Sequence, residues 1–155
     1  MEIDIFFDSK NSAAVRKHKN LLKKAVEYGL GIHAAGQGRV CLVLTGPVEM
    51  RGINKKFLKS SKNTDVIAFN YNPEQTGDKH IRELSSGILP FGDIYISYEQ
   101  AQKQADELKH TLLTELLILS AHGALHLSGM DDSNKIEKSK MDEKTDLIVR
   151  RILSK

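Results

Sequence analysis

Two histidines four residues apart are the side chains in this sequence best placed to do chemistry. His122 and His126 follow an apolar run, residues 112–121, that is typical of a buried helix. Side chains at i and i+4 lie on one face of a helix, one turn apart, so both imidazoles can point at one metal ion. Gly129 then allows the chain to turn, and Asp131 and Asp132 follow within reach of the same ion.

Zinc chemistry fits this set of donors. Zn²⁺ favours nitrogen and sulfur ligands, accepts carboxylate oxygen, and in catalytic sites keeps three protein ligands and a fourth position for water. His122 and His126 supply two ligands, and Asp131 or Asp132 is the candidate for the third. Such an ion lowers the pKa of its bound water towards about 7 and polarises a phosphoryl or carbonyl oxygen. An H-x-x-x-H pair also arises by chance, and it is the glycine and the aspartate pair beyond it that favour a metal site.

The spacing is close to that of the metallopeptidase motif H-E-x-x-H. In those proteases the glutamate after the first histidine is the general base, and Gly123 stands at that position here. A peptidase would therefore lack its proton acceptor, and the sequence argues against that class.

The composition predicts one globular domain that spans residues 1–155. The chain is 40% hydrophobic and 28% charged, and no apolar run reaches the length of a membrane span. The start of the chain is acidic and lacks the basic residues of a signal peptide. Cys41 is the only cysteine and lies in an apolar run, so we expect no disulfide framework and a reducing, cytoplasmic location. A net charge of +3 permits an anionic partner without demonstrating one.

Hydrophobic periodicity predicts a small mixed four-stranded sheet and about five helices, an α/β (α+β) fold with the metal site on the motif helix. The expected strands are residues 2–7, 39–45, 66–71 and 92–97. The expected helices are residues 11–28, 47–58, 98–108, one that starts near 111, and a final one after the aspartate pair. Ser97 and Gln100 fit a capping box for the third helix. The final helix is expected to bury one side, made of Ile136, Met141, Thr145, Ile148 and Ile152.

The histidine stretch resembles the signature of the YbeY family of bacterial endoribonucleases, H-G-x-L-H-L-x-G-Y-D-H. Seven of the nine fixed positions agree between residues 122 and 131. The two departures are Met130, where the family usually has tyrosine, and Asp132, where it has the third histidine. Upstream, the family segment L-N-x-x-Y-R…T-D-V-L-S-F is matched at the same spacing by residues 53–58 and 64–69. The family's G-D-I-x-I-S strand is matched by residues 92–97. Glu115 and Met141 also stand at the family's usual distances from the signature.

The resemblance implies a single α/β domain, a zinc-type ion held by three histidines, and a role in ribosomal RNA maturation and ribosome quality control. The maturation expected is that of the 3′ end of small-subunit RNA. A carboxylate at Asp132 in place of the third histidine adds a negative charge, which weakens the ion as a Lewis acid and favours harder metals. The family's arginine falls at Leu58, and its neighbour Lys59 offers a point charge rather than a fork.

We therefore expect His122, His126 and Asp132 to hold one Zn²⁺ per chain, or another divalent ion, whose water or a neighbouring RNA 2′-hydroxyl attacks a phosphodiester. Glu115 is either a residue that orients a ligating imidazole or a surface helix residue, and Asp131 either supports the site or caps the last helix. The candidates for contact with the RNA backbone are basic residues of the second helix and the loop after it: Arg51, Lys55, Lys56, Lys59 and Lys62. The alternative is a non-catalytic, RNA-binding ribosome-assembly factor of the same fold with a structural metal. No membrane partner is expected, and the sequence sets no oligomeric state.

Overall fold

The computed structural model describes residues 1–7, 10–58, 65–71 and 90–154. Its four strands are β1 (Glu2–Phe7), β2 (Arg39–Thr45), β3 (Val66–Asn70) and β4 (Pro90–Ser97). They form one mixed sheet in the order β1-β2-β4-β3, in which β3 alone runs antiparallel to its neighbour. The α-helices are α1 (Lys19–Leu30), α2 (Pro47–Leu58), α5 (Tyr98–Leu108), α6 (Leu112–Leu127) and α7 (Lys135–Leu153). Over these described residues, the predicted fold class, a mixed four-stranded sheet with five α-helices, is confirmed.

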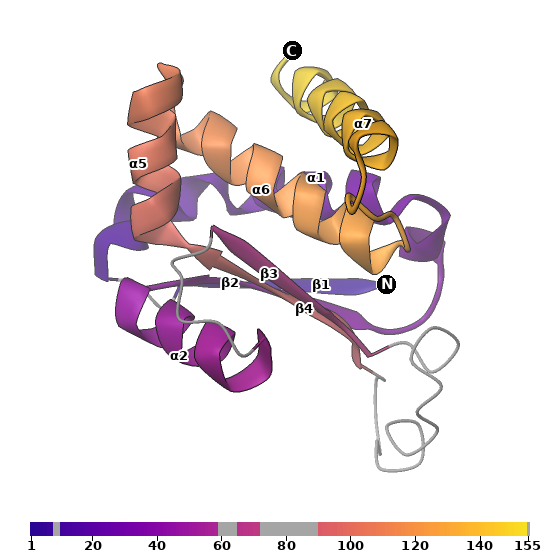
Figure 1. The fold of residues 1–155 in the computed structure, drawn as a ribbon, viewed down its shortest axis with the longest axis horizontal. Coiled ribbons are helices and arrows are strands. Elements are labelled where there is room, and N and C mark those ends of the chain that lie inside the picture. The colour runs from indigo at the N-terminus through magenta and orange to yellow at the C-terminus, as the bar shows by residue number, and fades with distance from the viewer. Residues whose placement is uncertain (8–9, 59–64, 72–89, 155) are drawn as a thin grey trace.

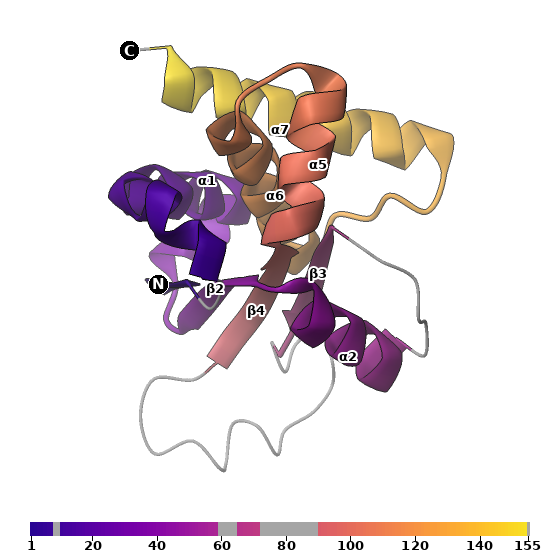
Figure 2. The ribbon, with the colours of Figure 1, turned by 90° about the vertical axis from the view of Figure 1, so that its left-hand side faces the viewer.

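The helices are divided unequally between the two faces of the sheet. Figure 1 and Figure 2 show α1, α5, α6 and α7 on one face and α2 on the other. Helix α6 lies at the centre of the larger layer, against the sheet and between α1, α5 and α7. It is apolar on almost every side, with ten of its residues buried, as expected of a helix that neighbours surround. His122 and His126 therefore belong to a helix that the sheet and three other helices surround.

Local sequence signals set the ends of these helices. The Ser97 hydroxyl accepts a hydrogen bond from the Gln100 amide N–H (3.2 Å) at the start of α5, but the Gln100 side chain bonds Gln104, so only half of the predicted capping box forms. Thr111 caps α6 in the same way. Asn134 caps α7 by accepting from the Glu137 N–H at 2.9 Å, which corrects the expectation that Asp131 could be that cap.

Two segments of helix differ from the prediction. The expected helix over 11–28 is divided: residues Lys10–His18 form a 3₁₀ helix, η1, and the α-helix begins only at Lys19. The reason is that the apolar stripe of the α-helix starts at Leu21, whereas residues 16–20 are all polar. A second 3₁₀ helix, η2 (Gly31–Ala35), follows α1 and was not predicted.

Ile136 was wrongly assigned to the buried side of the last helix, since it is 70% exposed. At 3.6 residues per turn, a five-residue step from Met141 turns the side chain by about 140°, away from the buried stripe. The other members of the predicted stripe, Met141, Thr145, Ile148 and Ile152, are buried.

None of the described helices is long and apolar enough to cross a membrane.

Gly123 lets α6 lie directly on the sheet. A Cβ atom at this position would stand 2.6 Å from the Cγ2 atom of Ile94, which is fully buried in β4. Close packing against β4 therefore explains why glycine stands between the two histidines. The same residue also argues against a peptidase, as noted above. The close approach fixes the height at which His122 and His126 stand over the strands.

Replacing Gly123 with alanine is expected to destabilise the protein by about 1–2 kcal/mol. An overpacked core costs roughly 1–3 kcal/mol, and the better helix propensity of alanine offsets up to about 1 kcal/mol of that loss. Urea denaturation measures the difference. Gly52→Ala is the matched control, because no atom lies within 4 Å of a Cβ built there, in the middle of α2. Equal effects of the two substitutions would contradict the packing role of Gly123.

Candidate metal centre

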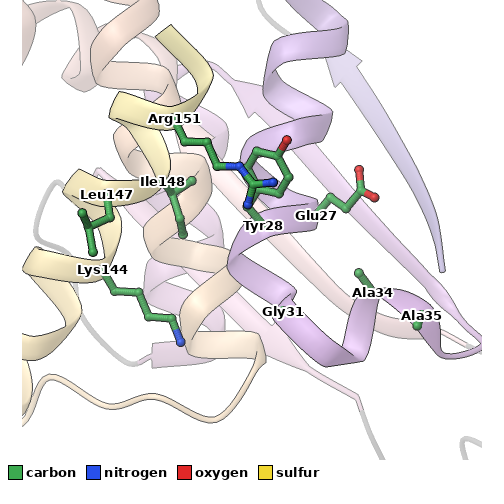
Figure 3. Close-up of a pocket in the computed structure, with 9 residues that line it drawn as sticks. All are labelled: Glu27, Tyr28, Gly31, Ala34, Ala35, Lys144, Leu147, Ile148 and Arg151. Carbon is green, nitrogen blue, oxygen red and sulfur yellow. The ribbon is translucent and has the colours of Figure 1, made fainter. Parts of the chain in front are cut away.

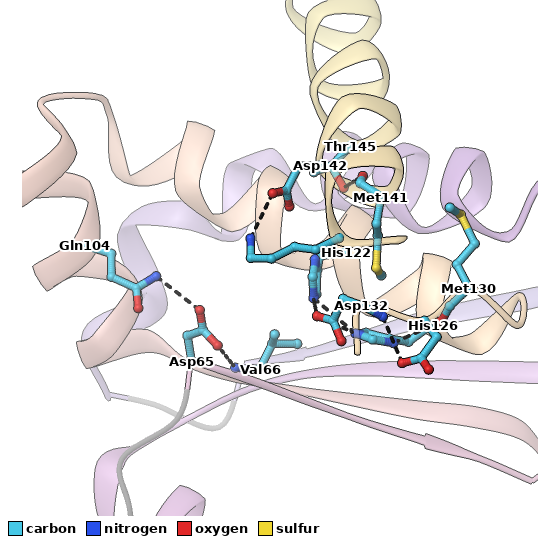
Figure 4. Close-up of polar contacts among 12 residues, drawn as sticks. Asp65, Val66, Gln104, His122, His126, Met130, Asp132, Met141, Asp142 and Thr145 are labelled. Atoms are coloured by element: carbon cyan, nitrogen blue, oxygen red, sulfur yellow. Dashed lines mark hydrogen bonds and ion pairs between the residues drawn. The ribbon is translucent and has the colours of Figure 1, made fainter. Parts of the chain in front are cut away.

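The end of α6 and the turn after it bring three potential metal ligands together. His122 and His126 stand on the last turns of α6, and Gly129, with φ 105°, ends the helix. Two backbone bonds close the turn, from the Gly129 N–H to the His126 carbonyl and from the Met130 N–H to the Leu125 carbonyl, both at 3.0 Å. A left-handed glycine with this bond pattern is a common helix stop. The turn carries Asp132 back towards the two imidazoles (Figure 4).

The three side chains form a compact triangle. His122 Nε2 lies 3.1 Å from His126 Nε2, and the Asp132 Oδ2 atom lies 3.5 Å from the first nitrogen and 3.6 Å from the second. Ligands held at about 2.0–2.2 Å in a tetrahedral zinc site stand about 3.3–3.6 Å apart. The donor atoms therefore already have nearly the spacing that a shared ion requires, and all three side chains are half-buried.

The Nε2 atoms of both histidines are available as metal ligands. The Nδ1 atom of His126 lies 3.2 Å from the Met130 carbonyl oxygen, so Nδ1 carries the proton and donates it, which leaves Nε2 free towards the triangle. Burial, and then the neighbouring His126, lower the pKa of His122 below its ordinary value. His122 is consequently neutral at pH 7, the form that binds a metal.

Comparison with known proteins assigns the chain to a family. A family model described as endoribonuclease YbeY matches residues 5–153. The chain belongs to the YbeY family. A curated relative from Elusimicrobium minutum, named endoribonuclease YbeY, is 39% identical and the match covers 98% of this chain and all of the relative. A relative of the same name from Endomicrobium trichonymphae is 34% identical, over 87% of this chain and 86% of its own.

The fold is also found among solved structures. The solution structure of TM1509 from Thermotoga maritima matches with a TM-score of 0.61 and 25% identity, over 98% of this chain and 89% of that one. The relatives' shared name supports the enzyme class predicted from the signature and does not favour the non-catalytic assembly factor.

The stretch of this chain that matches the signature, residues 122–132, contains two carboxylates with different positions in the structure. Asp132 points into the triangle, whereas Asp131 is exposed and accepts the Asp132 N–H through Oδ1 at 2.8 Å. Hydrogen bonds to the Asp131 carboxylate, chiefly from Ser133, hold its pKa below the ordinary value. Asp131 thus stabilises the turn, and Asp132 is the carboxylate that stands with the histidines.

Glu115 does not orient either imidazole of the triangle and is not a surface residue. Its side chain is only 3% exposed, and its two oxygens are bonded elsewhere, to His110 Nε2 at 2.5 Å and to Gln104 Nε2 at 2.9 Å. The same Gln104 nitrogen donates to Asp65 at 3.3 Å (Figure 4). The sequence interpretation missed this chain of bonds and left His110 without a partner. The signal was available, because an acidic residue inside an apolar helix needs a buried partner.

The basic residues expected to contact RNA are only partly described. Arg51 and Lys55 are exposed on α2, which covers the face of the sheet opposite to α6 (Figure 2). The structure therefore does not bring these two beside the triangle. Lys59 and Lys62 lie outside the described residues, as do the side chains of Lys56 and Leu58.

Proposed function

We propose that this YbeY-family chain is a metal-dependent endoribonuclease whose single Zn²⁺ is held by His122, His126 and Asp132. We further propose that its substrate is ribosomal RNA, at the 3′ end of the small-subunit RNA, and that it serves ribosome quality control in the cytoplasm. Family membership supports the reaction class, and the resemblance to the family's signature supports the choice of RNA.

The triangle of donor atoms is the observation that carries the proposal. Two neutral imidazoles and one carboxylate are a catalytic zinc ligand set, and such sets leave one coordination position for water or substrate. The separations of the donor atoms, 3.1, 3.5 and 3.6 Å, are close to those of such a set.

The chain's own residues divide the work at this site. When bound, a divalent ion supplies Lewis-acid chemistry, lowering the pKa of water and neutralising charge that develops on a phosphate. His126 is held in the ligating tautomer by the Met130 carbonyl, and the Asp131 carboxylate holds the turn that presents Asp132. The Asp132 carboxylate reduces the net positive charge of the site, which favours harder divalent ions more than three imidazoles would.

A cleavage assay tests the function directly. Wild-type protein loaded with zinc is expected to cut a single-stranded RNA that carries the small-subunit 3′ end. Chelation or His126→Ala is expected to reduce the rate at least about 100-fold, because even residues that only support a metal ligand cost 10- to 100-fold when lost. Gel analysis of end-labelled RNA gives the rate and the position of the cut.

The variant also serves as the control for contamination. Cleavage that survives His126→Ala would assign the activity to another protein or another site. RNA binding without cleavage by the zinc-loaded wild type would instead support the assembly factor.

A further inference from the structure

A second concave site lies on the other side of α7 from the metal centre. It is a cavity of about 580 Å³ between the end of α1, the 3₁₀ helix η2 and the C-terminal half of α7 (Figure 3). Its walls are mainly apolar and carry a few charged or aromatic groups. The lining residues used below are Glu27, Tyr28, Lys144, Leu147 and Arg151.

The helix geometry keeps this cavity apart from the metal centre. Asp142, drawn near His122 in Figure 4, lies on one flank of α7. Leu147 follows five residues later, which at 3.6 residues per turn places it about 140° around the helix. The cavity is thus a separate surface of the protein, and none of the three candidate metal ligands lines it.

A planar cation lines the cavity beside an aromatic ring. The Arg151 guanidinium lies over the Tyr28 ring, 4.3 Å from its centroid. This contact is a cation–π interaction. Proteins that bind single-stranded RNA stack unpaired bases on aromatic rings and on guanidinium planes of this kind.

The other walls complement the remaining parts of a nucleotide. Leu147 is 60% exposed and gives the cavity an apolar wall against which a base or ribose can pack. Lys144 extends its ammonium into the cavity from the α7 side, away from Glu27, whose carboxylate stands on the α1 side (Figure 3). A cation on one wall suits a phosphate, and a carboxylate on the other can only accept hydrogen bonds, so it suits the N–H groups of a base edge.

We propose that this cavity binds a guanine nucleotide, with the base stacked on the Tyr28–Arg151 pair and the phosphate at Lys144. Guanine is the base that presents two adjacent donors, N1–H and the N2 amino group, to one carboxylate. Glu27 can accept both, whereas adenine offers only its N6 amino group on that edge. The nucleotide comes either from the free pool or from a guanosine in an RNA strand, and only the second source rests on the proposed function.

Binding of mononucleotides to the full-length, metal-free protein tests the proposal without any need for activity. In heteronuclear NMR titrations, GMP is expected to shift the backbone amides of Gly31, Ala34 and Ala35, which line the cavity. GMP is expected to bind at least fivefold more tightly than AMP or guanosine. No shift at these amides, or equal affinity for GMP and AMP, would overturn the proposal and leave the endoribonuclease function untouched.

Matched variants separate a built site from general charge. Arg151→Lys keeps the charge but loses the plane, and we expect at least a fivefold loss of GMP affinity, since a base stack is worth roughly 5- to 150-fold. Glu27→Gln is expected to abolish the preference for GMP over AMP. Lys144→Ala should weaken binding several-fold, whereas Lys140→Ala, one turn away and outside the cavity, should not. Equal effects of the two lysine variants would show mere charge attraction and contradict the proposal.

A short RNA distinguishes the two sources. An RNA with one guanosine that binds at least tenfold more tightly than GMP, and whose gain is lost in Arg151→Lys, identifies the strand as the ligand. An RNA no tighter than GMP identifies the free nucleotide. Both outcomes are consistent with a guanine site. An RNA that does not displace bound GMP would also identify the free nucleotide as the ligand.

Discussion

Replacing Asp132 with alanine is expected to lower zinc affinity at least about 100-fold, since loss of a ligand exceeds the 10- to 100-fold cost of losing a residue that supports one. The Asp132 oxygen is the third corner of the triangle, 3.5 and 3.6 Å from the two imidazole nitrogens. Without it the ion keeps only two protein ligands. RNA cleavage should fall in parallel at limiting zinc. Equilibrium competition with a chromophoric chelator measures the affinity.

Asp131→Ala is the matched control. It removes the neighbouring carboxylate, which is exposed and bonded to the turn rather than directed at the histidines. Because Asp131 only holds the turn that presents Asp132, its loss is expected to lower zinc affinity about 10-fold, well short of the loss in Asp132→Ala. If Asp131→Ala proves the more damaging of the two, the third ligand has been assigned to the wrong aspartate.

Asp132→His restores the third histidine of the family signature and gives a more specific result. A neutral imidazole leaves the ion with more net positive charge than a carboxylate does, so water at the site becomes more acidic. The variant is expected to keep its zinc and to shift the acid limb of the pH–rate profile for RNA cleavage to lower pH. An unchanged profile would contradict an electrostatic role for Asp132.

The sequence predicted the features that depend on local pattern. The i,i+4 pair, the glycine turn and the aspartate that follows form the triangle because a helix and its stop signal have a fixed geometry. The strands were found because central strands such as β2 are apolar and β-branched. Pro47, which suits the first helical position, marked the start of α2 correctly.

The features that the sequence did not predict depend on contacts between distant segments. The apolar residues of the last helix fixed its buried side at Met141, and Ile136 was misplaced because its spacing was not converted into an angle. The cavity between α1, η2 and α7 joins residues more than 100 positions apart, and η2 itself was not expected. The sequence left Glu115 either beside the metal centre or on the surface, whereas it is buried and its partners come from α5 and the turn after it.

Glu115 therefore leads to a prediction about stability rather than about the metal. Glu115→Ala is expected to destabilise the protein by about 2–3 kcal/mol, because it removes a buried carboxylate that accepts hydrogen bonds from two neighbours. The side chain is 3% exposed, while its partner His110 is 25% exposed, so water can partly satisfy the imidazole left behind. Gln104 would keep its bond to Asp65 but lose the one to Glu115.

Glu107→Ala, an exposed glutamate of α5, is the control, and surface changes of this kind alter stability by less than about 0.5 kcal/mol. Urea denaturation gives both values, and Glu115→Gln should fall between them because an amide can still accept a hydrogen bond. Zinc affinity separates the two roles considered for Glu115. It should be unchanged in folded Glu115→Gln, because no oxygen of Glu115 bonds His122 or His126. A 10-fold or greater loss of zinc affinity without a loss of stability would instead return Glu115 to the metal centre.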